Sequence, residues 1–275
     1  MFSVFARLSG CPQGSNIVIG LFSDDEVARL SSELDCGSSE VEAFSYQAIK
    51  TGRYFLAIAF GKDGVSGSMA YRLRVSQDSR QPLLFPGHET VFLDFNGATR
   101  VQVGGGFWEN LLPLSSTFGA SRSTLIAGSV LETVRQDYAG FDIDILSSYQ
   151  NTEPSAAHSV VYIAGNRGEV LGLADSVNWY NSDLADRAVI FGGNFDFAGW
   201  TTAQIAKSIG NVVSHELGHL VGLSHTNDDT ELMDKATPDQ LLRDDQDFHR
   251  APLAEFPIGW QDPIELLDFI LGVSN

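Results

Sequence analysis

The sequence predicts two folds in series: an N-terminal β-sandwich, and a C-terminal α+β or α/β domain built around a largely parallel sheet. Short β-branched and aromatic runs, separated by clusters of Gly, Ser and Asp, fill residues 1–76 and are typical of a sandwich. Residues 77–88 carry two prolines after a polar start and predict a linker. Strand and helix patterns then alternate through residues 89–275, which predicts the second domain.

The first domain is expected to contain five strands. Each is a run of β-branched or aromatic residues with partial alternation, at 2–8, 17–22, 41–46, 53–59 and 70–75. Turn-forming residues occupy the gaps between these runs, which sets the regular strand spacing expected of a sandwich.

The second domain is expected to contain four strands and three helices. The strands are predicted at 90–95, 142–146, 159–164 and 188–191. A helix is predicted over 123–138, where apolar residues recur at helical spacing. A second helix starts from a cap at Thr201 or Thr202 and continues through Leu220. The last one has Asp262 as its N-cap and Pro263 as its first residue.

The composition limits the classes of partner. The 275 residues carry a formal net charge of -18, from 35 acidic and 17 basic residues, so nucleic acid and anionic membrane surfaces would be repelled. No apolar run approaches the roughly 18 residues that a membrane helix needs. The first residues do not have the layout of a signal peptide, because Arg7 interrupts a short apolar stretch. We expect a monomer.

The two cysteines do not predict a metal site. Cys11 and Cys36 both lie in the first third of the chain, and CxxC spacing is absent. They form either one disulfide in a secreted protein or two buried thiols, and the sequence leaves both alternatives open.

The segment His215-Glu216-Leu217-Gly218-His219 is the strongest functional signal in the chain. Residues four apart on a helix lie one above the other, so His215 and His219 can offer two imidazoles to one metal. Gly222 can adopt a positive φ and end the helix, and the turn that follows lets His225 supply a third nitrogen. Three nitrogen ligands with one open position for water are the donor set of a catalytic zinc site.

Glu216 is the predicted general base. It adjoins the first histidine, so its carboxylate can accept a proton from the metal-bound water and later pass it to the leaving amine. A bare HExxH occurs by chance, but the added requirement for Gly222 and His225 lowers a chance match to about 10⁻⁵ per chain.

HELGHLVGLSH, followed by Glu231-Leu232-Met233-Asp234, resembles the metzincin zinc peptidases, and Thr226 makes the matrixin branch the most similar. The resemblance implies a twisted mixed sheet, an active-site helix, a Met-turn at Met233 and a C-terminal helix. It also implies that Met233 forms a hydrophobic floor beneath the metal; an ordinary core methionine is the alternative.

Two further expectations come from the same resemblance. Leu173 and Ala174 follow a pattern similar to the matrixin edge strand that pairs with substrate, and an ordinary core strand is the alternative. The structural zinc of matrixins is not expected here, because the remaining histidines are scattered through the sequence: His88, His158 and His249.

The acidic residues have three readings: a soluble surface, adaptation to high salt, or loops that bind calcium. Calcium is a candidate ion because several groups offer carboxylate or amide oxygens. The candidates are Asp142 with Asp144, Asn194 with Asp196, and the run Asp244-Asp245-Gln246-Asp247. Solvent-facing strand positions are the alternative reading of such alternating polar residues.

Residues 1–76 resemble the bacterial pre-peptidase C-terminal domain, a small secreted sandwich. The similar stretches are SNIVIGLF from Ser15, SYQAIKTGRYFLAIA from Ser45 and GSMAYRLRV from Gly67. This resemblance implies a secreted, extracellular and bacterial protein.

The sequence therefore predicts a zinc-dependent endopeptidase, whose expected partner is a protein or peptide substrate. The alternatives are a non-catalytic module that retains the fold for binding, a matrix- or sugar-binding secreted module, and a zinc hydrolase acting on a non-peptide amide.

Overall fold

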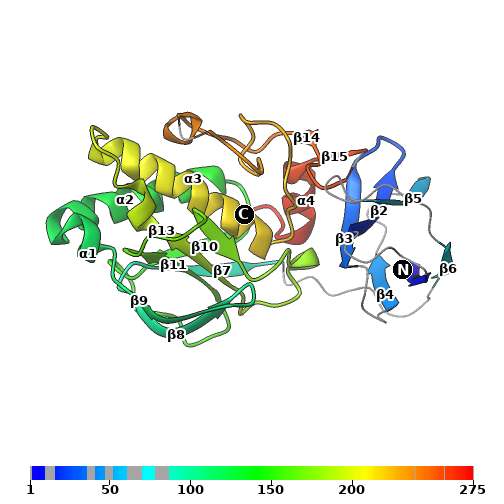
Figure 1. Cartoon of the computed structure of the whole chain (residues 1–275), viewed down its shortest axis with the longest axis horizontal. Helices are drawn as coiled ribbons and strands as arrows, with labels where there is room; N and C mark the ends of the chain where they lie inside the picture. Colours follow the sequence, from blue (N-terminus) through cyan, green and yellow to red (C-terminus); the bar gives the residue numbers. More distant parts are fainter. Residues whose placement is uncertain are drawn as a thin grey trace. The chain divides into compact units, whose positions relative to one another are not determined.

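The computed structural model describes residues 2–9, 16–35, 41–46, 52–60, 70–77, 87–238, 240–256 and 258–274 (Figure 1). The contacts divide the chain into two compact units. The first unit comprises Met1–Leu84, His225–Asn227 and Arg250–Asp262, and the second comprises Phe85–Ser224, Asp228–His249 and Pro263–Asn275. Cys11 and Cys36 lie outside the described residues, so the expectation of a disulfide stays a prediction.

The first unit contains two antiparallel sheets of three strands each. The first sheet has the order β4-β1-β6, with β4 at Val41–Tyr46, β1 at Phe2–Ser9 and β6 at Ala70–Gln77. The second has the order β3-β2-β5, with β3 at Ala28–Asp35, β2 at Asn16–Ser23 and β5 at Tyr54–Phe60. Five of these strands match the predicted runs within about two residues. Packing of the two sheets as a sandwich stays a prediction.

β3 was not expected, because polar residues dominate its second half, SSELD. It pairs along its whole length with β2, so cross-strand partners decide its conformation where local propensity is weak. A short antiparallel pair also belongs to this unit: β14 at Ala251–Pro252 and β15 at Trp260–Gln261.

The second unit is built on a mixed sheet of five strands in the order β10-β7-β11-β13-β12. The first four are parallel, and β12 is antiparallel to β13. Their bounds are Ile143–Ser147 for β10, Glu89–Asp94 for β7, Ser159–Ala164 for β11, Arg187–Phe191 for β13 and Gly172–Ala174 for β12. The four predicted strands of this domain are confirmed, and the mixed character of the sheet comes from β12 alone.

Both faces of this sheet are covered (Figure 1). Ala188 and Ile190 of β13 pack into the helix-side core, whereas Val189 and Phe191 pack into a smaller cluster on the opposite face. A hairpin, β8 at Ala98–Val103 and β9 at Gly106–Leu111, contributes to that smaller cluster. The hairpin was not predicted, although the Gly104-Gly105 pair between its strands is a recognised turn signal.

Helices α2 at Ala120–Asp137 and α3 at Thr202–Leu220 lie on the helix-side face of the sheet (Figure 1). The helix predicted over 123–138 is confirmed, but it begins three residues earlier, directly after Gly119. Gly210 allows α3 to approach α2 closely, because a Cβ there would lie 2.8 Å from Thr133 Cγ2.

The remaining helical elements are short. They are α1 at Ser115–Phe118, the 3-10 turns η1 at Trp179–Asn181, η2 at Gly192–Phe195 and η3 at Leu241–Arg243, and α4 at Pro263–Ile270. The predicted C-terminal helix is confirmed and begins at Pro263, whose missing N–H and fixed φ suit the first helical position. No helix among the described residues is both long enough and apolar enough to span a membrane.

Candidate metal centre

Helix α3 sets the positions of His215 and His219. Thr201 caps it: its side chain accepts a hydrogen bond from the Gln204 backbone N–H, while the Gln204 side chain accepts one from the Thr201 backbone N–H. The apolar face of the helix packs into the main core, so the helix cannot rotate about its axis without exposing that face. The two histidines, four residues apart, stack with ring centroids 4.9 Å apart and planes at 87°.

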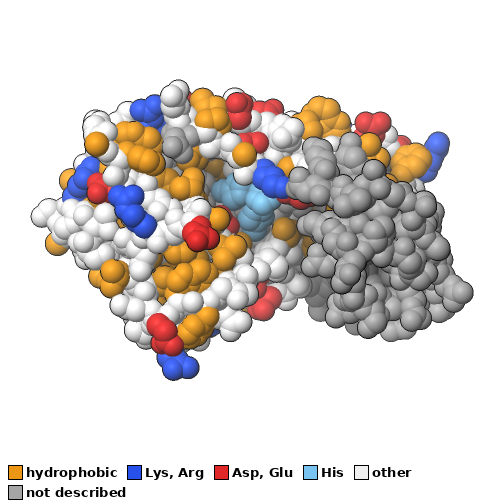
Figure 2. All heavy atoms as spheres, in the orientation of Figure 1, with side chains coloured by type: hydrophobic (Ala, Val, Ile, Leu, Met, Phe, Trp, Pro, Cys, Tyr) orange, Lys and Arg blue, Asp and Glu red, His pale blue; other side chains and the backbone are white. Residues whose placement is uncertain are grey.

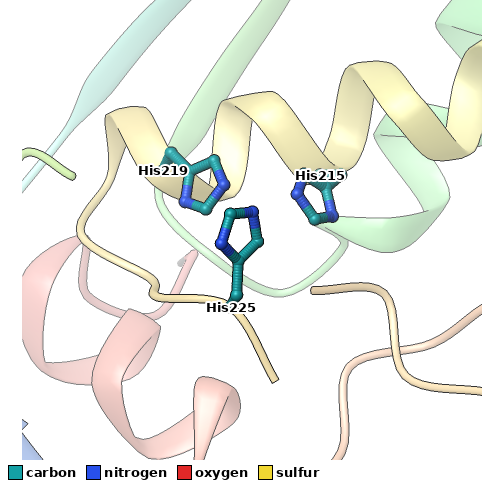
Figure 3. Close-up of side chains that lie close together, drawn as sticks. All are labelled: His215, His219 and His225. Carbon is teal, nitrogen blue, oxygen red and sulfur yellow. The ribbon is translucent and has the colours of Figure 1, made fainter. Parts of the chain in front are cut away.

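The chain leaves the helix in the way that the sequence predicts. Gly222 has a φ of 100°, which a residue with a Cβ rarely adopts. A hydrogen bond from Leu223 N to Gly218 O, at 2.8 Å, closes the turn. This turn brings His225 to the other two histidines (Figure 3).

The three histidines form a group that can hold a metal ion. One ring nitrogen from each of His215, His219 and His225 lies within 4.8 Å of the others. Figure 3 shows the three rings converging, two from the helix and one from the following loop. Figure 2 shows histidine side chains gathered at one spot on the visible face; His215 and His225 are partly exposed, whereas His219 is buried. In the part of the chain that the structure describes, no other group of three His, Cys, Asp or Glu residues meets this criterion.

The hydrogen bonds of the three rings fit a metal ion. Nδ1 of His215 lies 2.9 Å from Leu232 O, Nδ1 of His219 lies 2.8 Å from Leu223 O, and Nδ1 of His225 lies 2.9 Å from Glu255 Oε1. Each partner oxygen is a carbonyl or a carboxylate, which only accepts, so each Nδ1 carries the proton. The lone pair is then on Nε2, the tautomer of a metal-binding histidine whose other nitrogen donates to an oxygen.

Glu216 lies beside this group and is almost completely buried, with 7% of its surface exposed. Burial raises the pKa of its carboxyl group to about 8, and a hydrogen bond from the Ala174 backbone only partly opposes that rise. A Cβ on Gly172 would lie 2.5 Å from Glu216 Oε1, so β12 can approach the carboxylate only because this residue is glycine. The edge strand and the predicted base are therefore packed directly together.

Met233 is fully buried and packs against the backbone of α3 at Gly218, one residue before His219. Its backbone N–H donates to Glu231 Oε2 at 2.7 Å. The methionine thus lies on the helix surface that carries the histidines. This is the placement expected of a hydrophobic floor, and equally of a core methionine that fills a gap.

Leu173 and Ala174 lie on β12, the last strand in the sheet order. The Leu173 side chain packs against the cluster beneath the β8–β9 hairpin, and the hairpin turn at Gly104 reaches Ala174 O closely. These contacts agree with a structural strand and leave the predicted substrate role as a prediction.

The other three histidines each lie close to a carboxylate. His88 Nδ1 lies 2.8 Å from Asp142 Oδ1, His249 Nε2 lies 3.5 Å from Asp228 Oδ2, and His158 Nε2 lies 3.4 Å from Glu153 Oε1. Asn194 bonds to the backbone of Gly168 and Val170, so it serves the loop before β12. Calcium binding by any of these acidic groups stays a prediction.

Glu255 was missed by sequence reasoning. It lies 30 residues after His225 in a segment with no metal-binding pattern, so no local signal marks it. Its position became visible only through the hydrogen bond to His225.

Comparison with known proteins adds little to the site. No family model matches the chain, and no curated protein matches it. The chain is similar to the crystal structure of archaemetzincin from Methanopyrus kandleri, at 13% sequence identity and a TM-score of 0.39, over 69% of this chain and 99% of that chain. A likeness at that TM-score carries no argument about this chain, so any assignment must come from the site itself.

Proposed function

We propose that this protein is a zinc-dependent endopeptidase of the metzincin type, in which His215, His219 and His225 hold one zinc ion and Glu216 is the general base. The observation that carries the proposal is the convergence of three imidazoles, each of which donates its Nδ1 proton to an oxygen in a hydrogen bond. Zinc bound there would lower the pKa of a bound water to about 7 and polarise a peptide carbonyl.

The chain's own residues supply the positioning and the proton transfer. Burial raises the pKa of the Glu216 carboxyl to about 8. A zinc ion bound to the neighbouring histidines would lower that pKa and favour the ionised form that accepts a proton. The accepted proton then passes to the leaving amine, which makes one residue both base and acid. The Ala174 N–H holds the carboxylate in place while this happens.

A peptide substrate suits the edge of the sheet. β12 ends the strand order of the described sheet, and an extended peptide can add to such an edge through backbone hydrogen bonds. Leu173 and Ala174 would then be the substrate-binding residues, on the same short strand that contacts Glu216 through Gly172 and the Ala174 backbone. The resemblance of residues 1–76 to a secreted bacterial domain supports the further proposal of an extracellular, monomeric enzyme.

The test separates metal binding from chemistry. Purified protein is assayed for zinc stoichiometry and for cleavage of a peptide library, with and without a chelator. Glu216→Gln keeps the shape of the side chain but cannot accept the proton, so we expect about one zinc per chain with a loss of roughly 10²–10⁴-fold in kcat/KM. Glu132→Gln, at an exposed position on α2, is the matched control and should resemble the wild type.

Two outcomes would contradict the proposal. Wild-type protein that binds no zinc would remove the metal site. A Glu216→Gln variant as active as the control would show that the base is another group.

A further inference from the structure

The three histidines differ in what holds their Nδ1 protons. His215 and His219 donate to backbone carbonyls of Leu232 and Leu223. His225 instead has a side-chain partner, the carboxylate of Glu255 at 2.9 Å. Of the three rings, His225 is therefore the one whose hydrogen-bonded partner can be removed by a substitution.

We propose that Glu255 is a positioning residue for the third metal ligand. Its carboxylate accepts the Nδ1 proton of His225, which fixes the tautomer and orientation that turn Nε2 toward the metal. The inference rests on the proposed zinc site. It adds a residue that no sequence motif marks.

The backbone around this pair limits how the two side chains move. Ala254 N donates to His225 O at 3.0 Å, and Asn227 N donates to Pro252 O at 2.8 Å. Thr226 and Leu253 form an antiparallel bridge between these two hydrogen bonds. The segment that carries His225 is thus paired, residue by residue, with the segment that carries Glu255.

The Glu255 segment is in turn fixed to the strands of the first unit. Phe256 packs edge-on against Phe22 with ring centroids 5.0 Å apart, in a buried cluster that includes Leu253. Arg250 Nη2 donates to Asp25 O at 2.7 Å, and Trp260 N donates to Glu26 O at 3.0 Å. Glu255 therefore lies between Ala254, which is hydrogen-bonded to His225, and Phe256, which is packed on Phe22. The fold of this unit thus sets the distance from Glu255 to His225.

The side chains of His225 and Glu255 are 32% and 29% exposed, so water partly screens the pair. A modest energy is expected for such a contact by itself. The contribution of this pair to function is that it orients the ring of His225. Removing a partner of this kind typically weakens metal binding by about 10- to 100-fold.

The experiment measures zinc affinity by competition with a chromophoric chelator. We expect Glu255→Ala to weaken zinc binding by roughly 10- to 100-fold. Glu255→Gln keeps an oxygen that can accept the same proton, so it should bind zinc several-fold more tightly than the alanine variant. Glu132→Ala, an exposed glutamate on α2, is the control and should match the wild type.

Two readouts distinguish positioning from ordinary structural support. The visible absorption of the cobalt-substituted protein should change in Glu255→Ala, because the geometry at the ion changes. The thermal unfolding midpoint of the metal-free protein should stay near that of the control. If the alanine variant fails to fold, Glu255→Met repeats the test, since it keeps the length of the side chain with only a weak acceptor.

The outcomes separate this inference from the function on which it rests. Wild-type protein without zinc would remove both. Wild-type protein with stoichiometric zinc, and a Glu255→Ala variant with the affinity and cobalt spectrum of the control, would overturn the role of Glu255 alone. An alanine variant that loses metal-free stability while its zinc affinity is unchanged would also overturn it.

Discussion

Two regions of the molecule supply the three proposed metal ligands, and each region fixes its histidines in a different way. His215 and His219 stand on a capped helix of 19 residues whose buried face belongs to the main core. His225 stands on an irregular segment that is held by hydrogen bonds to residues 252–255. The helix and its packing fix the backbone of the first pair, whereas the position of His225 depends on hydrogen bonds to a segment about 30 residues further along the chain.

The comparison indicates where the site tolerates change. A helix packed into a large core places its side chains rigidly, because moving them would disturb many contacts. A loop ligand is placed by a few hydrogen bonds, each of which contributes about 1 kcal/mol. We therefore expect substitutions in the two regions to differ in their effects on zinc affinity and on the stability of the metal-free protein.

Removing one ligand from each region should give the largest effect. Both His219→Ala and His225→Ala should weaken zinc binding on the order of 10³-fold, because zinc binding worth about 10–16 kcal/mol is shared among few ligands. His219 is buried and His225 is partly exposed, so only His219→Ala should also lower the stability of the metal-free protein. Zinc titration and metal-free thermal unfolding measure the two effects. Tight stoichiometric zinc in His225→Ala would place the third ligand elsewhere.

The next largest effect is expected from truncating Phe256, the buried residue that follows Glu255 in the chain. Phe256→Ala removes a buried ring that packs on Phe22, and should cost about 3 kcal/mol in local stability. Hydrogen exchange at the Ala254 amide, which bonds to His225 O, should speed up, and zinc affinity should fall.

The matched control for this change is Phe118→Ala, a similar truncation in the main core. It should lower stability without altering zinc affinity. Equal zinc affinities in the two variants would show that the loop ligand does not depend on its anchor.

A smaller effect is expected from a buried carboxyl beside the helix. Burial raises the pKa of Asp137 to about 6, and Ser214 Oγ donates to it at 2.5 Å. Because the folded-state pKa is above the unfolded value, folding favours the protonated form. The contribution of Asp137 to the free energy of unfolding should therefore be largest below pH 4, and should fall by about 2 kcal/mol as pH rises from 4 to 6.

Asp137→Asn should flatten this part of the pH profile, measured by urea unfolding of the metal-free protein. Asp186 also has a pKa raised to about 6 by burial, so the variant should keep part of the slope. A profile identical to that of the wild type would mean that Asp137 is not responsible for the slope.

Much of the second unit could be predicted from local pattern. Thr201 with Gln204 marks the start of α3, and Gly222 marks the turn after it, because capping and positive φ are local requirements. The β8–β9 hairpin was missed because it depends on packing against the sheet, which a local pattern does not show, whereas a strand at β12 was expected through Leu173 and Ala174. β3 was missed for the same reason, because its pairing with β2 outweighs its polar residues.

The sequence by itself determined the candidate ligand set, the predicted base and the helix that carries two of the three histidines, because spacing along one helix and one turn encodes them. Only the tertiary structure decided that Gly172 gives β12 access to Glu216, and that Glu255 meets His225 across 30 residues. No sequence periodicity or motif predicts either contact, because contacts between distant segments depend on how the chain folds. The proposed metal ligands can thus be predicted from the local sequence, whereas the groups that contact them are determined by tertiary packing.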